Sequence, residues 1–254
     1  MHREVVTRVM LDPNDRKRPV SVAARAPKTW DFMETTFVAL VAYAVFGLTS
    51  WLTLLVLVAT RDSAALSQAQ LQAMPRGWDS AASILGCAST IIVLWIAIGV
   101  ARREFSEYLA LNWPTRDEVM AALMITIILW LGEIVFGSPT APSTSPHLPL
   151  RGIGELLILF VAVCIAAPIM EEFTFRGFMF RGWSESFLGP TATIVVTAAI
   201  WGALHTQCDW WARCWIFVSG IALGHFRRRS NSTWLAVIVH SGLNFFLFLT
   251  MRYA

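Results

Sequence analysis

Residues 168–177, with the sequence PIMEEFTFRG, end a strongly apolar run with two adjacent carboxylates and an arginine. If the segment is helical, Glu172 and Arg176 stand four residues apart and can form an ion pair along one face. Glu171 then points about 100° away from Glu172 and is free for other work. Charged residues after an apolar helix can also mark only where the lipid ends, so the rest of the chain has to decide between a boundary and a functional site.

The composition places the chain among membrane proteins. Of its 254 residues 56% are hydrophobic and only 15% are charged, with 12 tryptophans, and the mean hydropathy is +0.57. These values lie outside the composition of soluble globular domains and predict an all-α, polytopic membrane protein. Basic residues lie beside the apolar runs instead of forming a stripe of their own, so nucleic-acid binding has no support.

Seven apolar runs are long enough to be read as transmembrane helices. They cover residues 36–60, 81–101, 118–136, 153–171, 190–206, 211–226 and 233–250. A further helix or re-entrant segment would escape this pattern, so we expect seven or eight spans around an intramembrane polar cavity. The chain then divides into a basic cytoplasmic tail (1–35), N-terminal transmembrane helices (36–136), a Pro/Ser-rich outer loop (137–152) and a catalytic transmembrane core (153–254).

The distribution of basic residues predicts the orientation. Lysine and arginine favour the cytoplasmic side of short loops, and most of them fall on the side of the N-terminus in this seven-span topology. The first 35 residues contain no apolar stretch followed by a small-residue cleavage site, which argues against a signal peptide. We therefore expect a multi-pass protein with a cytoplasmic N-terminus, located in the bacterial inner membrane.

The C-terminal half carries several polar residues inside its spans. His205 ends the run 190–206, while His240 and Asn244 lie four residues apart on one face of the last run. Placing an ionisable side chain within a span costs free energy, so each such residue is by default a functional candidate. From the helical rise of roughly 1.5 Å per residue, these groups and Glu171 can meet in one layer. The arithmetic requires residues 172–188 to form a semi-polar amphipathic helix beneath the site.

These residue types are the parts of a hydrolase that acts on an amide. Glu171 could take a proton from water and return it to the leaving amine while one imidazole orients that water. The other imidazole and Asn244 could donate hydrogen bonds to the developing oxyanion. Alternatively, Glu171, His205 and His240 could hold Zn²⁺ with an open position for water. The residue types allow the metal-free glutamate mechanism and the zinc mechanism equally.

The cysteines give no CxxC pair, so they indicate neither a thiolate zinc site nor a redox motif. Cys208 and Cys214 are close enough in sequence to bridge if their loop is extracytoplasmic, and two unpaired thiols are the favoured interpretation.

Three spaced motifs resemble the CAAX protease and bacteriocin-processing family of intramembrane endopeptidases. The motifs are Glu171-Glu172 with Arg176, then Trp201 with His205, then His240 with Asn244. The match covers about residues 153–250, whereas the N-terminal third contributes only general membrane character. One departure is Trp201, where the family usually has Phe, and we expect this wider ring to narrow the cavity without touching the chemistry.

The resemblance implies a helical intramembrane protease fold and hydrolysis of a peptide bond. It implies Glu171 as general base, His205 as its partner on the water, and His240 with Asn244 as oxyanion or ligand groups. Glu172, Arg176 and Trp201 would then shape the site. The expected partners are the bilayer and a peptide or protein substrate, including prenylated or leader-containing ones.

Two other classes of protein would also keep such a pocket. A non-catalytic membrane scaffold or immunity-type protein would bind a peptide in it without cleavage, and a small transporter would justify intramembrane Glu and His residues. Transporters usually show repeats and broken helices at the midplane, and neither is apparent in this sequence. Because every proposed catalytic position is filled, the endopeptidase is the leading hypothesis.

Overall fold

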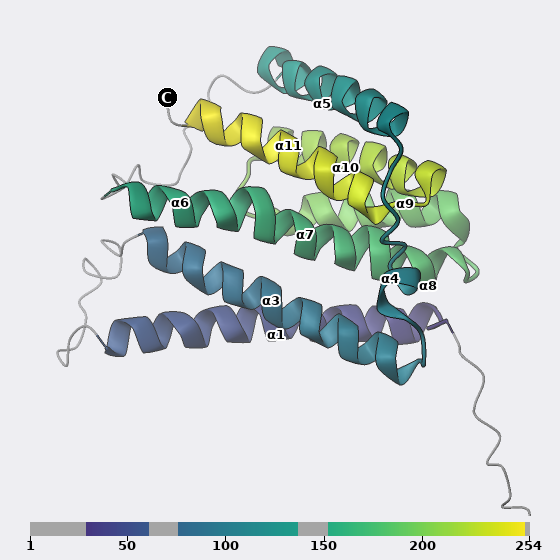
Figure 1. Ribbon diagram of the computed structural model, residues 1–254, viewed down its shortest axis with the longest axis horizontal. Helices are drawn as coiled ribbons and strands as arrows, with labels where there is room; N and C mark the ends of the chain where they lie inside the picture. The colour runs from purple at the N-terminus through teal and green to yellow at the C-terminus, as the bar shows by residue number, and fades with distance from the viewer. Residues whose placement is uncertain (1–28, 61–75, 137–151, 252–254) are drawn as a thin grey trace, which may run out of the picture.

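The computed structural model describes residues 29–60, 76–136 and 152–251, and these ranges are built from helices (Figure 1). The longer helices are α1 (Phe32–Ala59), α3 (Arg76–Val100), α5 (Arg116–Phe136), α9 (Gly189–Leu204), α10 (Trp210–Ser230) and α11 (Thr233–Met251). A short α4 (Phe105–Tyr108) lies between α3 and α5. The only β-structure in the described ranges is an isolated bridge between Leu111 and Ser232. The expectation of an all-α protein is therefore confirmed for this part of the chain.

Helices α1 and α3 form an antiparallel pair along one side of the molecule (Figure 1). Asp31 and Glu34 form a capping box that fixes the start of α1. Inside the pair, the hydroxyl of Thr90 donates to the carbonyl of Ala42, and that of Ser50 donates to the carbonyl of Ala82. Such bonds give a hydroxyl a partner where water is absent.

One long helix runs across the centre of the molecule from Ile153 to Ser184. It consists of α6 (Ile153–Val161), η1 (Ala162–Ala166), α7 (Ala167–Glu172), η2 (Phe173–Met179) and α8 (Phe180–Ser184), where the η segments are π-helical. Residues 172–180 are buried around the whole helix. The expectation of an amphipathic helix over 172–188 is therefore wrong, because neighbouring helices cover every face of this segment up to Phe180.

Helices α9 and α10 pack closely through glycines. A Cβ atom added to Gly220 would lie 2.8 Å from Cβ of Ala198, and one added to Gly224 would lie 2.8 Å from Cγ2 of Ile194. Neither distance leaves room for a side chain, so the two glycines let the helix backbones approach. Helix α11 then packs against α5 and α10 and completes the C-terminal half.

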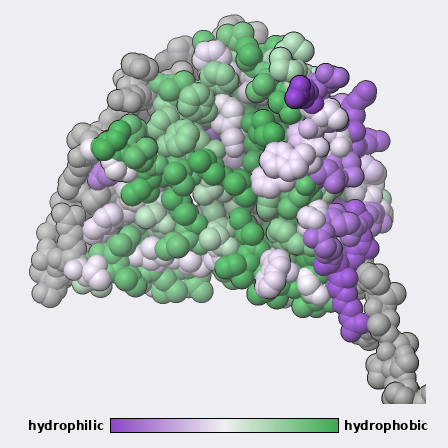
Figure 2. Space-filling model, in the orientation of Figure 1, coloured by the Kyte–Doolittle hydropathy of each residue, from purple (hydrophilic) through white to green (hydrophobic). Residues whose placement is uncertain are grey.

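The surface has the character of a membrane protein. Hydrophobic side chains cover most of the face in Figure 2, and hydrophilic ones gather at the end where α1 begins and α4 lies. Large apolar side chains are exposed along the helices, for example Leu40 at 64% and Ile128 at 65%. In water such surfaces would be unfavourable, whereas lipid tails satisfy them.

Among the described residues, three helices are long and apolar enough to cross a membrane: Phe32–Ala59, Gly77–Val100 and Ile153–Ser184. They correspond to three of the seven predicted spans. Two more runs form shorter apolar helices, Gly189–Leu204 and Thr233–Leu249. The runs 118–136 and 211–226 form α5 and α10, which do not meet these criteria. The count of seven or eight spans stays a prediction.

Other sequence-based expectations fall partly outside the described ranges. Most of the 1–35 tail and nearly all of the 137–152 loop lie there. Cys208 and Cys214 are described, and both are free thiols.

Candidate active site

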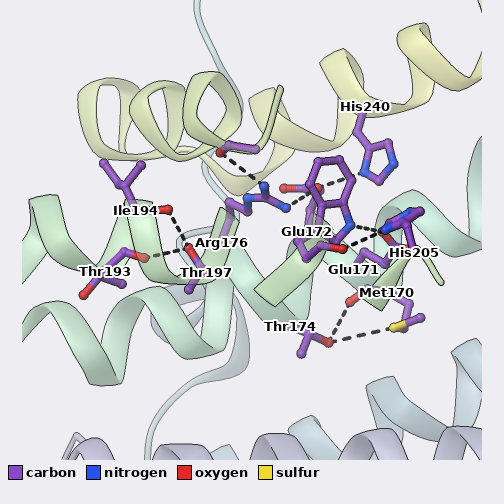
Figure 3. A network of polar contacts seen from close by, with 12 residues as sticks. Met170, Glu171, Glu172, Thr174, Arg176, Thr193, Ile194, Thr197, His205 and His240 are labelled. Atoms are coloured by element: carbon purple, nitrogen blue, oxygen red, sulfur yellow. Dashed lines mark hydrogen bonds and ion pairs between the residues drawn. The ribbon is translucent and has the colours of Figure 1, made fainter. Parts of the chain in front are cut away.

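Glu172 lies at the centre of a buried polar network (Figure 3). Its side chain is fully buried, and Oε1 accepts from Nη1 of Arg176 at 2.9 Å. Nδ1 of His240 lies 2.8 Å from the same oxygen. The predicted ion pair between Glu172 and Arg176 is therefore confirmed, and α11 joins it through His240. One carboxylate thus links two positively polarised groups from two helices.

Arg176 extends this network to α10. Its side chain is 1% exposed, and Nη2 donates to the carbonyl of Gly220 at 3.2 Å. The guanidinium carbon lies 4.7 Å from the ring centre of Trp201, a cation–π contact. Nε of Arg176 and Oε2 of Glu172 are buried without a hydrogen-bond partner among the described residues. The network therefore contains one donor and one acceptor without partners, and such buried groups commonly bind water or a ligand.

Glu171 faces away from that pair, as the helical spacing predicts. Its Oε2 accepts a hydrogen bond of 2.5 Å from the indole N–H of Trp201 on α9. Trp201 is 4% exposed and lies edge-on to two imidazoles, with ring-centre distances of 5.3 Å to His205 and 5.0 Å to His240. The expectation that this ring would only narrow the cavity missed its N–H, which contacts the proposed general base directly.

His205 ends α9 and is partly buried. Its Nδ1 lies 2.7 Å from the carbonyl of Trp201 in the preceding turn. A neutral imidazole whose Nδ1 carries the proton would donate to that carbonyl and turn the Nε2 lone pair outward. The short turn after His205 is held by Arg213, which donates to the carbonyls of Thr206 at 2.7 Å and Cys208 at 2.9 Å. Arg213 therefore fixes the backbone that carries His205.

A pocket of about 380 Å³ brings Glu171 and His205 together. Trp201 forms part of the same wall, and the remaining lining is mostly apolar. Helix α1 contributes Thr36, Ala39, Leu40, Tyr43 and Phe46 to the pocket. The N-terminal helices are thus part of the site and not only of its membrane support.

His240 and Asn244 do not line this pocket. His240 is 4% exposed, contacts the Trp201 ring, and has its Nδ1 engaged with Glu172. Nδ2 of Asn244 donates to the carbonyl of Val163 at 2.9 Å. Of the four residues expected around one cavity, the structure brings Glu171 and His205 onto its wall and leaves the other two behind it.

The contact between Asn244 and Val163 has a local backbone cause. In η1 the N–H of Ala167 donates to the carbonyl of Ala162, five residues back. In that register the carbonyl of Val163 would need the N–H of residue 168, which is proline and has none. The side-chain amide of Asn244 supplies the missing donor. Asn244 therefore holds the π-helical segment just before Glu171.

The second π-helical segment is held in the same way. Nε of Arg227 on α10 donates to the carbonyl of Arg176 in η2 at 2.9 Å. Arg227 is 3% exposed and lies over the ring of Phe180 at 5.1 Å. Single π-helical turns are rare and frequently accompany functional sites. Here one lies on either side of Glu171-Glu172, and a side chain from a neighbouring helix secures each of them.

The set Glu171, His205 and His240 does not form a zinc site in this arrangement. Within the described ranges, no three His, Cys, Asp or Glu side chains lie close enough together to hold a metal ion. His240 turns Nδ1 to Glu172, and Glu171 turns Oε2 to Trp201.

Several residues of the site escaped the sequence analysis. Thr174 and Gln207 line the pocket, and Arg213 holds the turn after His205. Thr174 follows Glu171 by three residues and so shares its helix face, which is a usable signal. The sequence signal for Arg213 is weaker, since it is only a single basic residue that follows a candidate histidine closely.

The fold and the site define a helical integral membrane protein with an acidic and an imidazole side chain on the wall of one pocket. Residues 153–246 match the family model described as type II CAAX prenyl endopeptidase Rce1-like. The match runs from the start of α6 into α11 and confirms the resemblance that the sequence motifs predicted for this part of the chain. No curated protein and no solved structure matches the chain.

Proposed function

We propose that this protein is an intramembrane endopeptidase that hydrolyses a peptide bond of a membrane-associated or lipid-modified substrate. The family match supports protease activity in general. The observation that carries the proposal is that Glu171 and His205, from different helices, line the same pocket. The pocket is mostly apolar, and an ionised carboxylate acts more strongly in such surroundings than in water.

In the proposed reaction, Glu171 accepts a proton from a water molecule whose oxygen attacks the carbonyl carbon of the scissile bond. The lone pair of His205 orients that water. Collapse of the tetrahedral intermediate breaks the C–N bond, and Glu171 returns the proton to the leaving nitrogen. The products are a free carboxyl group and a free amine.

We assign the oxyanion contact to His240. Its Nδ1 contacts Glu172, and a doubly protonated ring would keep Nε2–H as a donor. His240 does not line the pocket, so this assignment requires its imidazole to turn toward the scissile carbonyl when substrate binds. Asn244 is less suited to this role, because its amide already donates to Val163. We propose that it supports the site from behind.

We further propose that the N-terminus lies in the cytoplasm of a bacterium and that the protein lies in the inner membrane. The hydrophilic end in Figure 2, where α1 begins, agrees with the excess of basic residues on that side of the predicted topology. Labelling of single cysteines introduced at Ser106 and at Asp209 from either side of the membrane tests this orientation.

The function is tested with purified protein in lipid and a quenched fluorescent peptide that ends in a farnesylated CAAX sequence, beside its unprenylated counterpart. We expect cleavage by the wild type and none by Glu171→Gln. Unchanged cleavage by Glu171→Gln would contradict the proposed mechanism. Tight binding of the peptide without cleavage would favour the scaffold or immunity-type alternative.

A separate measurement tests whether the activity depends on bound zinc. Active protein is analysed for bound metal and then treated with a chelator. The metal-free glutamate mechanism predicts full activity after treatment. Stoichiometric zinc, with activity that the chelator abolishes and zinc restores, would replace it by the zinc mechanism.

A further inference from the structure

We infer that Trp201 is a positioning residue, whose indole N–H aims the Glu171 carboxylate at the attacking water. This inference rests on the proposed function, and it assigns to Trp201 a part in the chemistry. The N–H contacts Oε2 of Glu171 at 2.5 Å. Hydrogen bonds to ionised acceptors are short and about twice as strong as neutral ones.

The chemistry of indole suits this task. Its N–H is a donor only, so it cannot compete with Glu171 for the proton of the water. Within the described residues, Oε2 is the only Glu171 oxygen with a hydrogen bond, and Oε1 is left for the water. A phenylalanine at position 201 would fill similar space but would leave Glu171 free to rotate.

The ring itself is firmly held. The guanidinium of Arg176 lies 4.7 Å from the ring centre, and His205 and His240 approach it edge-on. Gly220 leaves room for the ring, because a Cβ atom there would lie 3.2 Å from Cε3 of Trp201. Because these contacts hold the Trp201 ring, its N–H can hold the Glu171 carboxylate in one orientation.

The first experiment reads the contact without any activity. In ¹⁵N-tryptophan-labelled protein, the indole N–H signal that disappears in Trp201→Phe is the signal of Trp201. We expect Glu171→Gln to move that signal upfield, because a neutral amide is a weaker acceptor than a carboxylate. Glu107→Gln, on the exposed surface, serves as the control and should leave it in place. A Trp201 signal that ignores Glu171→Gln would overturn the inference.

The second experiment measures turnover of the farnesylated peptide. We expect Trp201→Phe to lower kcat about 10-fold, the effect of losing one hydrogen bond to a charged group, with KM changed less than about twofold. The matched control is Trp215→Phe, which removes an indole N–H donated to the carbonyl of Leu129 away from the pocket. An equal kcat in Trp201→Phe and Trp215→Phe would contradict the inference.

A double substitution separates a positioning role from a structural one. If Trp201 acts through Glu171, then Trp201→Phe should have no further effect on the residual rate of Glu171→Gln. An independent additional loss would mean that Trp201 only supports the fold. Loss of activity in Glu171→Gln together with normal activity in Trp201→Phe would overturn this inference alone. Full activity in Glu171→Gln would overturn the proposed function.

Discussion

Glu172 on α7 and His240 on α11 share a hydrogen bond of 2.8 Å in a region where both side chains are almost fully buried. The same carboxylate oxygen holds Arg176 at 2.9 Å. The site helix and the last helix are therefore tied together through one carboxylate, one layer behind the pocket that contains Glu171.

Replacement of this buried carboxylate should be strongly destabilising. Glu172→Gln leaves the guanidinium of Arg176 buried without its counter-charge, and loss of one partner of a buried pair costs about 3–5 kcal/mol. The free energy of unfolding in mixed micelles measures the loss. The control is Glu107→Gln, which breaks half-exposed pairs with Arg103 and Arg181 and should cost less than about 1 kcal/mol. Equal costs for the two variants would contradict this account.

Asn244 should matter to stability through Val163. Asn244→Leu keeps the size of the side chain but leaves the Val163 carbonyl without a donor, at a cost of about 1–3 kcal/mol. Pro168→Ala restores a backbone N–H next to that carbonyl, so the same substitution should cost clearly less in that background. Unfolding of the four proteins gives the coupling energy. Identical costs in both backgrounds would show that Pro168 is not the cause.

The turn that carries His205 should depend on Arg213. Arg213→Gln removes two hydrogen bonds to backbone carbonyls and should lower kcat about fivefold or more, with a small change in thermal stability. Arg228→Gln is the control, because the guanidinium of Arg228 donates to the hydroxyl of Thr191 at the surface, away from the turn that carries His205. If both variants cleave the peptide at the wild-type rate, Arg213 has no part in holding His205.

The contact between α9 and α10 should tolerate no added methyl group. Gly220→Ala places a Cβ 2.8 Å from that of Ala198, and overpacking of this kind typically costs about 1–3 kcal/mol. Gly99→Ala, at an open helical position with nothing within 4 Å, should be neutral or slightly stabilising. Thermal unfolding of both variants checks the contrast, and a stable Gly220→Ala would disprove the close approach.

Local spacing explains which features were predictable from the sequence. The pair of Glu172 with Arg176 and the opposite direction of Glu171 follow from helical periodicity. The helical rise placed Glu171 and His205 at similar heights, and both line one pocket even though the π-helical segment η2 lies between Glu171 and α9.

Other features depend on tertiary contacts that no local pattern records. Two π-helical turns change the direction of side chains around the site, and hydropathy does not register them. Asn244 shares a helical face with His240, yet the unpaired Val163 carbonyl draws its amide away from the pocket. The contribution of α1 to the lining was also invisible, because its composition is that of an ordinary lipid-facing span.

The length of α9 has a consequence for the surrounding lipid. Its 16 residues rise about 24 Å, which is less than the roughly 30 Å thickness of a typical hydrocarbon core. If α9 spans the membrane, as the sequence predicts, the polar turn at Thr206–Asp209 would lie within the hydrocarbon of a bilayer of that thickness, and we expect the bilayer to become thinner beside this helix. A dimple of this kind would bring bulk water close to His205, and turnover would then depend on the acyl-chain length of the membrane in which the protein is placed.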